Sequence, residues 1–96
     1  MDYQPKPLDT SEIHLPGELD ELLEKLAQNT HEVWAAQRLR DGWQFGPERD
    51  DSRRLHPCLI PYDELPEEEK EYDRHTSQEA LKAILAAGFT IERKTD

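Results

Sequence analysis

Between residues 17 and 42, side chains that could form one helix face recur at steps of three and four. The face that they outline consists of Leu19, Leu22, Leu23, Leu26, Thr30, Val33, Trp34 and Gln37. This spacing matches the roughly 3.6 residues of an α-helical turn, so it predicts one long helix of about six turns. Gly42 would end this helix, because glycine readily adopts the left-handed conformation that follows helix ends. Alternatively, Asn29 and Thr30 could cap the start of a second helix and divide the segment in two.

The segment before this helix shows no such period. Early prolines favour an extended backbone, which predicts an N-terminal extended arm over residues 1–16. Three apolar side chains of the arm are expected to pack on the body of the domain: Leu8, Ile13 and Leu15.

Glycine and proline interrupt residues 43–65, and this predicts a long ordered loop with one short extended piece over Cys58–Tyr62. After Pro66, three consecutive glutamates suit the positive end of a helix dipole. We therefore expect a short helix that begins at Pro66 and ends near Arg74.

A further short helix is predicted by the capping box Thr76-Ser77-Gln78-Glu79, with Gly88 as its end. Residues Phe89–Arg93 alternate between apolar and polar side chains, which predicts a short edge strand. The expected fold class is mainly α with minor β: one long helix, two shorter helices, a long ordered loop and the extended arm. We expect a single domain over residues 17–93 and a disordered tail over residues 94–96.

Composition favours one small domain. The chain has 96 residues, of which 34% are hydrophobic and 35% are charged. It is too short for two cores, and its low hydrophobicity approaches that of disordered chains, so folding requires economical packing, an oligomeric partner, or both. No apolar run approaches the roughly 20 residues of a membrane span, and the first residues lack the pattern of a secretion signal. With Cys58 as its single cysteine, the chain is expected in the cytoplasm and not in a membrane.

Charge narrows the classes of partner. The formal net charge of −10 argues against a general nucleic-acid binder, which needs a basic face. The charge is unevenly distributed, because residues 38–56 hold five arginines against four acidic side chains, a net of +1. This segment could therefore bind a small anion.

The predicted long helix carries a candidate binding stripe. His31 and Arg38 lie three residues before and four residues after Trp34, so the three side chains share one side of the helix. Such a stripe could hold a flat ring bearing phosphate, since the indole stacks on the ring and the guanidinium binds phosphate oxygens. The alternative is structural: Trp34 would be half-buried in the core, with the arginine covering its ring.

The loop offers further candidates. Phe45 and Tyr62 are expected to pin the loop onto the helices, whereas Trp43 is open to either a packing or a ligand-binding role. Arg49 follows the Gly46-Pro47 turn, and it is the arginine of its charged cluster that we expect to have a fixed role.

Catalytic and metal chemistry have little support in the sequence. His56 and Cys58 are too few ligands for a closed zinc site. They also flank a proline, an arrangement that rarely directs both side chains at one substrate, as a nucleophilic pair requires. We interpret Cys58 as a small buried apolar group. The sequence lacks phosphate-binding glycine loops, and we expect no enzymatic activity, no catalytic residue, no metal ion and no cofactor.

Five stretches, in order and without large gaps, follow one pattern from Tyr3 to about Ile91. They are Tyr3-Gln-Pro-Lys-Pro-Leu-Asp-Thr-Ser, Leu26-Ala-Gln-Asn-Thr-His-Glu-Val-Trp-Ala, Gly42-Trp-Gln-Phe-Gly-Pro-Glu-Arg-Asp-Asp, Leu55-His-Pro-Cys-Leu-Ile-Pro-Tyr-Asp-Glu-Leu-Pro-Glu-Glu-Glu-Lys-Glu-Tyr-Asp-Arg and Glu79-Ala-Leu-Lys-Ala-Ile-Leu-Ala-Ala-Gly-Phe. Together they closely resemble the RyR repeat, the ryanodine receptor domain.

The resemblance implies a mostly helical, non-enzymatic module with the RyR-repeat fold. In calcium-release channels the repeats are paired, and an adenine nucleotide is associated with the cleft between two copies, where a tryptophan of each stacks on the base. By its motif, that tryptophan corresponds to Trp34. Stand-alone copies occur in bacteria, archaea and their viruses, where a role in sensing nucleotide-derived signals has been proposed, and this chain resembles such a copy.

The expected function is therefore a sensor that binds a purine nucleotide or a nucleotide-derived signal. The expected ligand-binding residues are Trp34, His31, Arg38, Trp43 and Arg49. Because the chain has one copy of the repeat, a cleft between two repeats requires a homodimer, in which two Trp34 side chains would face each other. The alternative is a protein-interaction adaptor whose acidic surface docks a basic partner without any small molecule.

Overall fold

The long helix predicted from the hydrophobic spacing is present and uninterrupted in the computed structural model, which describes residues 2–94. A single 3-10 turn, η1 (Gly17–Leu19), leads into α1 (Asp20–Arg40). Gly42, with a φ of 89°, follows the helix end as predicted. The alternative start at Asn29 and Thr30 is wrong, because the Thr30 hydroxyl donates a hydrogen bond back to the Leu26 carbonyl, at 2.9 Å, within one continuous helix.

The second half of the chain forms one helix where we expected two. Helix α2 runs without a break over Glu67–Ala86, and the prediction of an end near Arg74 is wrong. The segment contains neither glycine nor proline, so nothing in its backbone interrupts the helix. The side chain expected to close the capping box, Glu79, instead accepts a hydrogen bond from Thr10 at 2.6 Å. Gly88, with a φ of 97°, follows the end of α2 as predicted.

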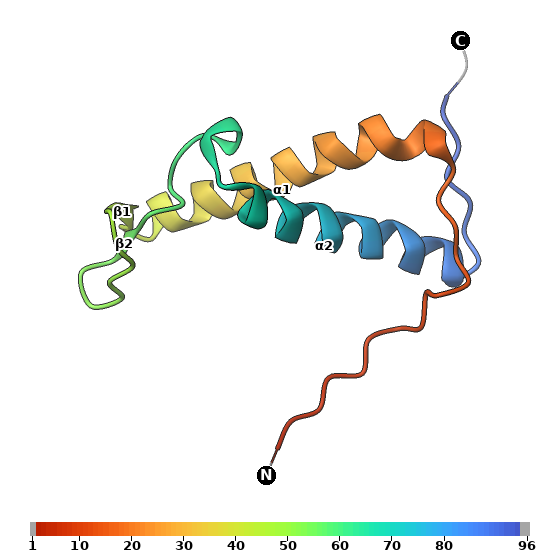
Figure 1. The fold of residues 1–96 in the computed structure, drawn as a ribbon, viewed down its shortest axis with the longest axis horizontal. Coiled ribbons are helices and arrows are strands. Elements are labelled where there is room, and N and C mark those ends of the chain that lie inside the picture. Colours follow the sequence, from red (N-terminus) through yellow and green to blue (C-terminus); the bar gives the residue numbers. More distant parts are fainter. Residues whose placement is uncertain (1, 95–96) are drawn as a thin grey trace.

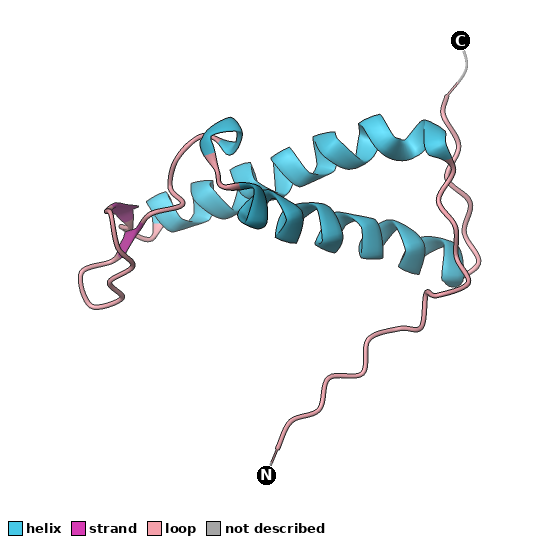
Figure 2. Ribbon diagram, viewed as in Figure 1, coloured by secondary structure: helices cyan, strands magenta, loops and turns pink. Residues whose placement is uncertain are grey.

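Both strands found in the described part of the chain lie in the long loop (Figure 2). Strands β1 (Gln44–Phe45) and β2 (Leu55–His56) pair in parallel, with Gln44 opposite Leu55 and Phe45 opposite His56. The extended piece expected over Cys58–Tyr62 is wrong: Cys58 lies in a turn, Ile60 lies in a bend, and a 3-10 turn, η2 (Tyr62–Glu64), begins at Tyr62. The edge strand expected over Phe89–Arg93 is also wrong: within residues 2–94 the sheet has two strands, so this segment has no neighbouring strand to pair with.

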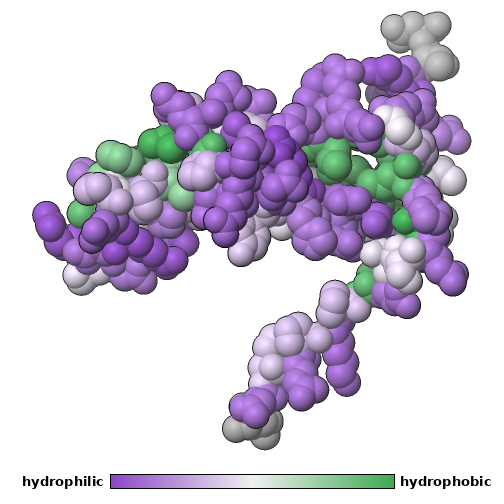
Figure 3. All heavy atoms as spheres, viewed as in Figure 1, coloured by the Kyte–Doolittle hydropathy of each residue, from purple (hydrophilic) through white to green (hydrophobic). Residues whose placement is uncertain are grey.

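Helices α1 and α2 run side by side in opposite directions, and the loop folds over one end of the pair (Figure 1). A small core forms where α1, η2 and the start of α2 meet, around Ala27, Tyr62 and Leu65. The half-buried Cys58 packs against this core, in line with its expected role as a small apolar group. Figure 3 shows hydrophobic atoms gathered along the seam between the helices, with hydrophilic atoms over most of the remaining surface.

A polar network also joins the helices. The Arg74 guanidinium of α2 donates to Glu24 of α1 at 2.8 Å, and to Glu71 and Glu67 of its own helix at 2.6 and 3.1 Å. The Tyr62 hydroxyl donates to the same Glu24 at 3.0 Å. Burial, followed by the hydrogen bond to Glu24, raises the pKa of Tyr62 to about 12, so this hydroxyl remains a donor at neutral pH. The prediction that Tyr62 pins the loop is therefore confirmed.

The predicted packing of two other apolar side chains is wrong. Phe45, in the exposed strand β1, is 57% exposed and so does not pin the loop. Leu8 is 66% exposed, because the arm contacts α2 mainly through the buried Thr10 while its first residues lead away from the helices (Figure 1). Ile13 and Leu15 are half-buried, as expected.

The division into an arm, a domain over 17–93 and a tail stays a prediction. Apart from Lys94, the tail expected over residues 94–96 lies outside the described residues. Within residues 2–94, neither long helix is apolar enough to cross a bilayer.

Candidate ligand-binding pocket

One side of α1 forms the floor of a pocket. Ala27, His31, Trp34 and Arg38 follow one another at steps of three and four, so they share this side of the helix. The rings of His31 and Trp34 are stacked, with centroids 5.6 Å apart and planes inclined by 29°. The Arg38 guanidinium carbon lies 5.6 Å from the Trp34 ring centroid. Trp34 is half-buried, so part of its indole is available to a ligand.

The end of β2 and the loop after it cover this floor. His56 meets the indole of Trp34 edge to face, with centroids 4.9 Å apart. The backbone N–H of Cys58 donates to His56 Nδ1 at 3.0 Å, and this bond requires that Nδ1 carry no proton. On the floor, Nε2–H of the buried His31 donates to the Ile60 carbonyl at 2.7 Å. The bond from His31 ties the loop to α1, and the bond from Cys58 fixes the orientation of the His56 ring.

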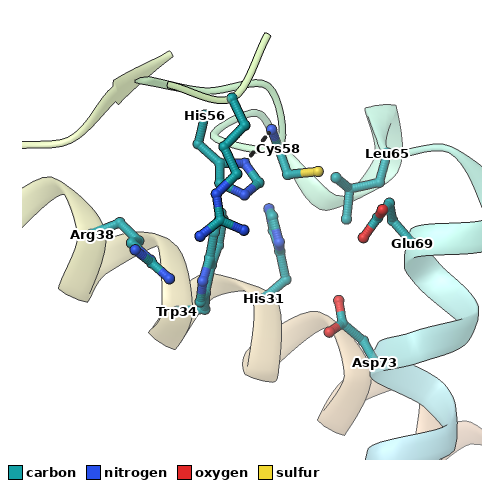
Figure 4. A pocket seen from close by; sticks show the side chains of 9 residues that line it. His31, Trp34, Arg38, His56, Cys58, Leu65, Glu69 and Asp73 are labelled. Atoms are coloured by element: carbon teal, nitrogen blue, oxygen red, sulfur yellow. Dashed lines mark hydrogen bonds between the residues drawn. The ribbon is translucent and has the colours of Figure 1, made fainter. Parts of the chain in front are cut away.

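Helix α2 closes the opposite end with two carboxylates. Glu69 and Asp73 are separated by one helical turn, and Figure 4 shows both side chains directed toward His31 and Cys58. The resulting cavity has a volume of about 250 Å³. Its lining residues, called the Trp34 pocket below, are His31, Trp34, Arg38, Arg49, His56, Cys58, Leu65, Glu69 and Asp73.

The pocket brings together four of the five predicted ligand-binding residues: His31, Trp34, Arg38 and Arg49. Trp43 does not line the cavity. Instead its ring lies beneath the guanidinium of Arg38, at 4.6 Å from the carbon to the ring centroid, and next to His56 at 6.3 Å. Trp43 therefore holds Arg38 in place between two indole rings, as a cation–π contact does.

The pocket carries opposite charges at its two ends. At one end, the Arg38 guanidinium makes no hydrogen bond or ion pair with any residue in 2–94. Arg49 pairs with Asp51 at 2.8 Å, but both side chains are more than half exposed, so this pair is weak and open to exchange. At the other end, neither Glu69 nor Asp73 has a hydrogen-bonding or ion-pairing partner among the described side chains.

These surroundings shift three pKa values. Burial, reinforced by the charges of Arg49 and Arg38, lowers the pKa of His56, so its imidazole is neutral at pH 7. Burial raises the pKa of Asp73, with His31 opposing and Glu69 adding to the shift. Burial, reinforced by Glu69 and Asp73, also raises the pKa of Cys58. The Cys58 thiol therefore stays protonated at neutral pH and is not activated as a nucleophile.

Five lining residues were not predicted to bind a ligand: His56, Cys58, Leu65, Glu69 and Asp73. The sequence does carry one signal for the carboxylates. Glu69 and Asp73 are spaced by four residues and face one side of α2, whereas Glu67 and Glu71 face Arg74 on another side. Within residues 2–94, no three histidine, cysteine or acidic side chains are grouped so as to hold a metal ion.

The comparison with known families agrees with the resemblance described above. The family model of the RyR domain matches residues 3–93. The match therefore includes α1, the loop and α2, and with them every residue that lines the Trp34 pocket.

Proposed function

Since this chain belongs to the RyR domain family, we propose that it is a non-enzymatic binding module whose ligand is a purine nucleotide or a nucleotide-derived signal held in the Trp34 pocket. One observation carries the proposal. The unpaired guanidinium of Arg38 lies against Trp34 and Trp43, at the edge of a cavity walled by aromatic rings. A positive charge beside an accessible indole suits a ligand that joins a flat ring to an anion.

The ring of the ligand would lie against the accessible part of Trp34. Stacking of a base on an aromatic side chain contributes roughly 1–3 kcal/mol. The cavity volume of about 250 Å³ is slightly below the range of roughly 300–1,000 Å³ that is common for small-molecule pockets. The pocket therefore suits a single flat ring, with the phosphates outside the cavity and over the arginines.

The phosphates would bind Arg38 and Arg49. Arg38 needs no rearrangement, because its guanidinium has no carboxylate partner among residues 2–94 and is already oriented by the two indoles. Arg49 would exchange its exposed bond to Asp51 for a bond to phosphate. Two guanidinium groups at one end supply enough donors for a bidentate contact with phosphate oxygens.

We propose further that the working form is a homodimer that covers the open side of the pocket. The described core contains only four buried hydrophobic residues, while large apolar side chains remain exposed on α1 and β1, at Val33, Leu39 and Phe45. Phe45 is the β-register partner of the pocket residue His56, so a copy that buries Phe45 would lie next to the pocket. Analytical sedimentation at high micromolar concentration should show a dimer. A monomer at that concentration would contradict the proposed cleft between two copies.

Isothermal titration calorimetry with AMP, ADP-ribose and cyclic AMP tests the binding proposal. Arg38→Ala should weaken binding about tenfold or more, because it removes a charge-assisted contact. Arg40→Ala is the matched control, since Arg40 lies on the same helix turn but is exposed and does not line the cavity. Trp34→Leu should weaken binding by removing the stacking surface. Equal affinities for the Arg38 and Arg40 variants would contradict the proposed site.

The alternative function, a protein-interaction adaptor, would use the acidic start of α2. Two of its three glutamates already make contacts within the chain: Glu67 pairs with Arg74, and Glu69 lines the pocket. This arrangement favours the ligand-binding function. A partner captured by the chain and released by charge reversal at Glu68 would support the adaptor instead.

A further inference from the structure

The order of chemical groups along the Trp34 pocket suggests which ring it accepts. Arg38, Trp34 and His31 lie on successive turns of α1, which rise by about 5 Å each. Beyond His31, Glu69 and Asp73 reach toward the same space from α2 (Figure 4). The pocket therefore leads from a cationic end, past an aromatic surface, to two carboxylates. A nucleotide with its phosphate on Arg38 and its base on Trp34 would direct the far edge of the base toward these carboxylates.

The two carboxylates lack partners inside the protein. Neither carboxylate accepts a hydrogen bond from any side chain or backbone group in residues 2–94, and Lys70, the cation next to Glu69 in sequence, pairs with Glu67 instead. An ionised carboxylate can only accept hydrogen bonds. Asp73 is half-buried and lacks a donor, which is unfavourable, whereas Glu69 is exposed. Burial, and to a smaller extent Glu69, raise the pKa of Asp73 against the opposing effect of the nearby His31. A ligand edge that donates hydrogen bonds would remove the mismatch.

From this juxtaposition we propose that the pocket selects a guanine-type base over adenine. The edge of such a base presents adjacent N–H donors to Glu69 and Asp73. This inference rests on the proposed function of the pocket. Guanine offers N1–H and its 2-amino group side by side, which a carboxylate accepts together. Adenine offers its 6-amino group beside the N1 lone pair, and that lone pair would face a carboxylate oxygen. A site with fixed polar groups discriminates strongly against a ring that leaves those groups unpaired.

Calorimetric titration of the full chain with GMP, IMP and AMP tests the selection. IMP retains N1–H but lacks the 2-amino group, so affinity should fall in the order GMP, IMP, AMP. We expect GMP to bind about tenfold or more tightly than AMP, the effect of a hydrogen-bonded charged group. Asp73→Asn and Glu69→Gln should each weaken GMP binding and should not weaken AMP binding, because an amide can donate to adenine N1. Glu68→Gln is the matched control, because Glu68 lies on α2 outside the pocket.

The outcomes separate this inference from the function on which it rests. Equal binding of GMP and AMP, with both lost in Arg38→Ala, would overturn the guanine selection and keep the nucleotide site. A preference for GMP that survives both Asp73→Asn and Glu69→Gln would also overturn it. Absence of binding by all three nucleotides would overturn the guanine selection, and the proposed function would also be overturned if ADP-ribose and cyclic AMP failed to bind. Thermal unfolding of each variant checks that the variant is folded, so that a loss of affinity can be assigned to the binding site.

Discussion

The imidazole of His56 meets the indole of Trp34 edge to face, with ring planes inclined by 74°. This contact joins the loop to α1, and it positions the roof of the pocket over its floor. The imidazole is itself fixed by the bond from the Cys58 N–H to Nδ1. Protonation of Nδ1 would break that bond, so the state of His56 is coupled to the shape of the pocket.

His56 should titrate below the ordinary histidine value of 6.5, because burial and two nearby arginines oppose its positive charge. A lowered histidine pKa means that its contribution to stability is present above pH 6.5 and is lost as the pH falls through the folded-state pKa. Bound phosphate would neutralise Arg38 and Arg49, so the pKa of His56 should rise when a nucleotide is added. NMR titration of the imidazole, with and without GMP, measures both effects.

Arg49→Gln provides the control for the titration. It removes the larger of the two arginine contributions, so the pKa of His56 in the free protein should move upward. Arg40→Gln should leave the pKa of His56 unchanged, since Arg40 does not contribute to it. An identical His56 titration in the free and the nucleotide-bound protein would contradict a phosphate site beside this ring.

The parts of the fold that could be predicted are those encoded within one segment. The hydrophobic period of α1 and the glycines that follow both helices are local signals. They were sufficient to predict the course of α1 and the ends of both helices. The capping box at Thr76–Glu79 is also local, yet it lies inside α2, because an unbroken helix accommodates it and Thr10 binds Glu79 from a distant segment. The strands β1 and β2 have two residues each, too few to leave a pattern.

The candidate site follows the same division. Trp34, His31 and Arg38 share one helix face, and the period of that helix placed them together. His56, Glu69 and Asp73 come from other elements, so their approach depends on how the loop and α2 pack, which no local spacing specifies. One contact of this packing, the hydrogen bond from His31 to the Ile60 carbonyl, joins α1 to the loop between residues far apart in sequence.

Gly46 should be intolerant of a side chain. A Cβ at this position would lie 2.7 Å from the Cβ of Leu55, so β2 would have to move and take His56 with it. Gly46→Ala should lower the free energy of unfolding by about 1–3 kcal/mol, the usual effect of overpacking, and should weaken nucleotide binding. Urea unfolding and calorimetry measure these losses. Gly17→Ala is the control, because a Cβ there meets nothing within 4 Å, and an equal effect of both substitutions would contradict the prediction.

The Arg74 network should make the free energy of unfolding depend on pH in the acidic range. Arg74 lowers the pKa of Glu24 and of Glu67 below the ordinary value of 4.5. A lowered carboxyl pKa stabilises the fold above about pH 4.5, and the stabilisation is lost as the pH falls through the folded-state pKa. Arg74→Gln should therefore lower the free energy of unfolding at pH 7 and reduce its decrease between pH 5 and pH 3. Urea unfolding of the wild-type protein and the variant across this pH range measures the difference. Parallel plots of unfolding free energy against pH would contradict the prediction.

Asp73 should oppose folding in the free protein, because burial and Glu69 raise its pKa above the ordinary value of 3.8. A raised carboxyl pKa means that the favourable contribution is present at low pH and is lost as the pH rises through the folded-state pKa. Asp73→Asn should therefore raise Tm at pH 7, and the gain should disappear below about pH 3.8. Asp2→Asn removes the same charge from the exposed arm and controls for the net charge of −10. A variant that is more stable but binds GMP more weakly would show that this carboxylate is kept for its ligand, whereas a lower Tm would mean that Asp73 stabilises the fold.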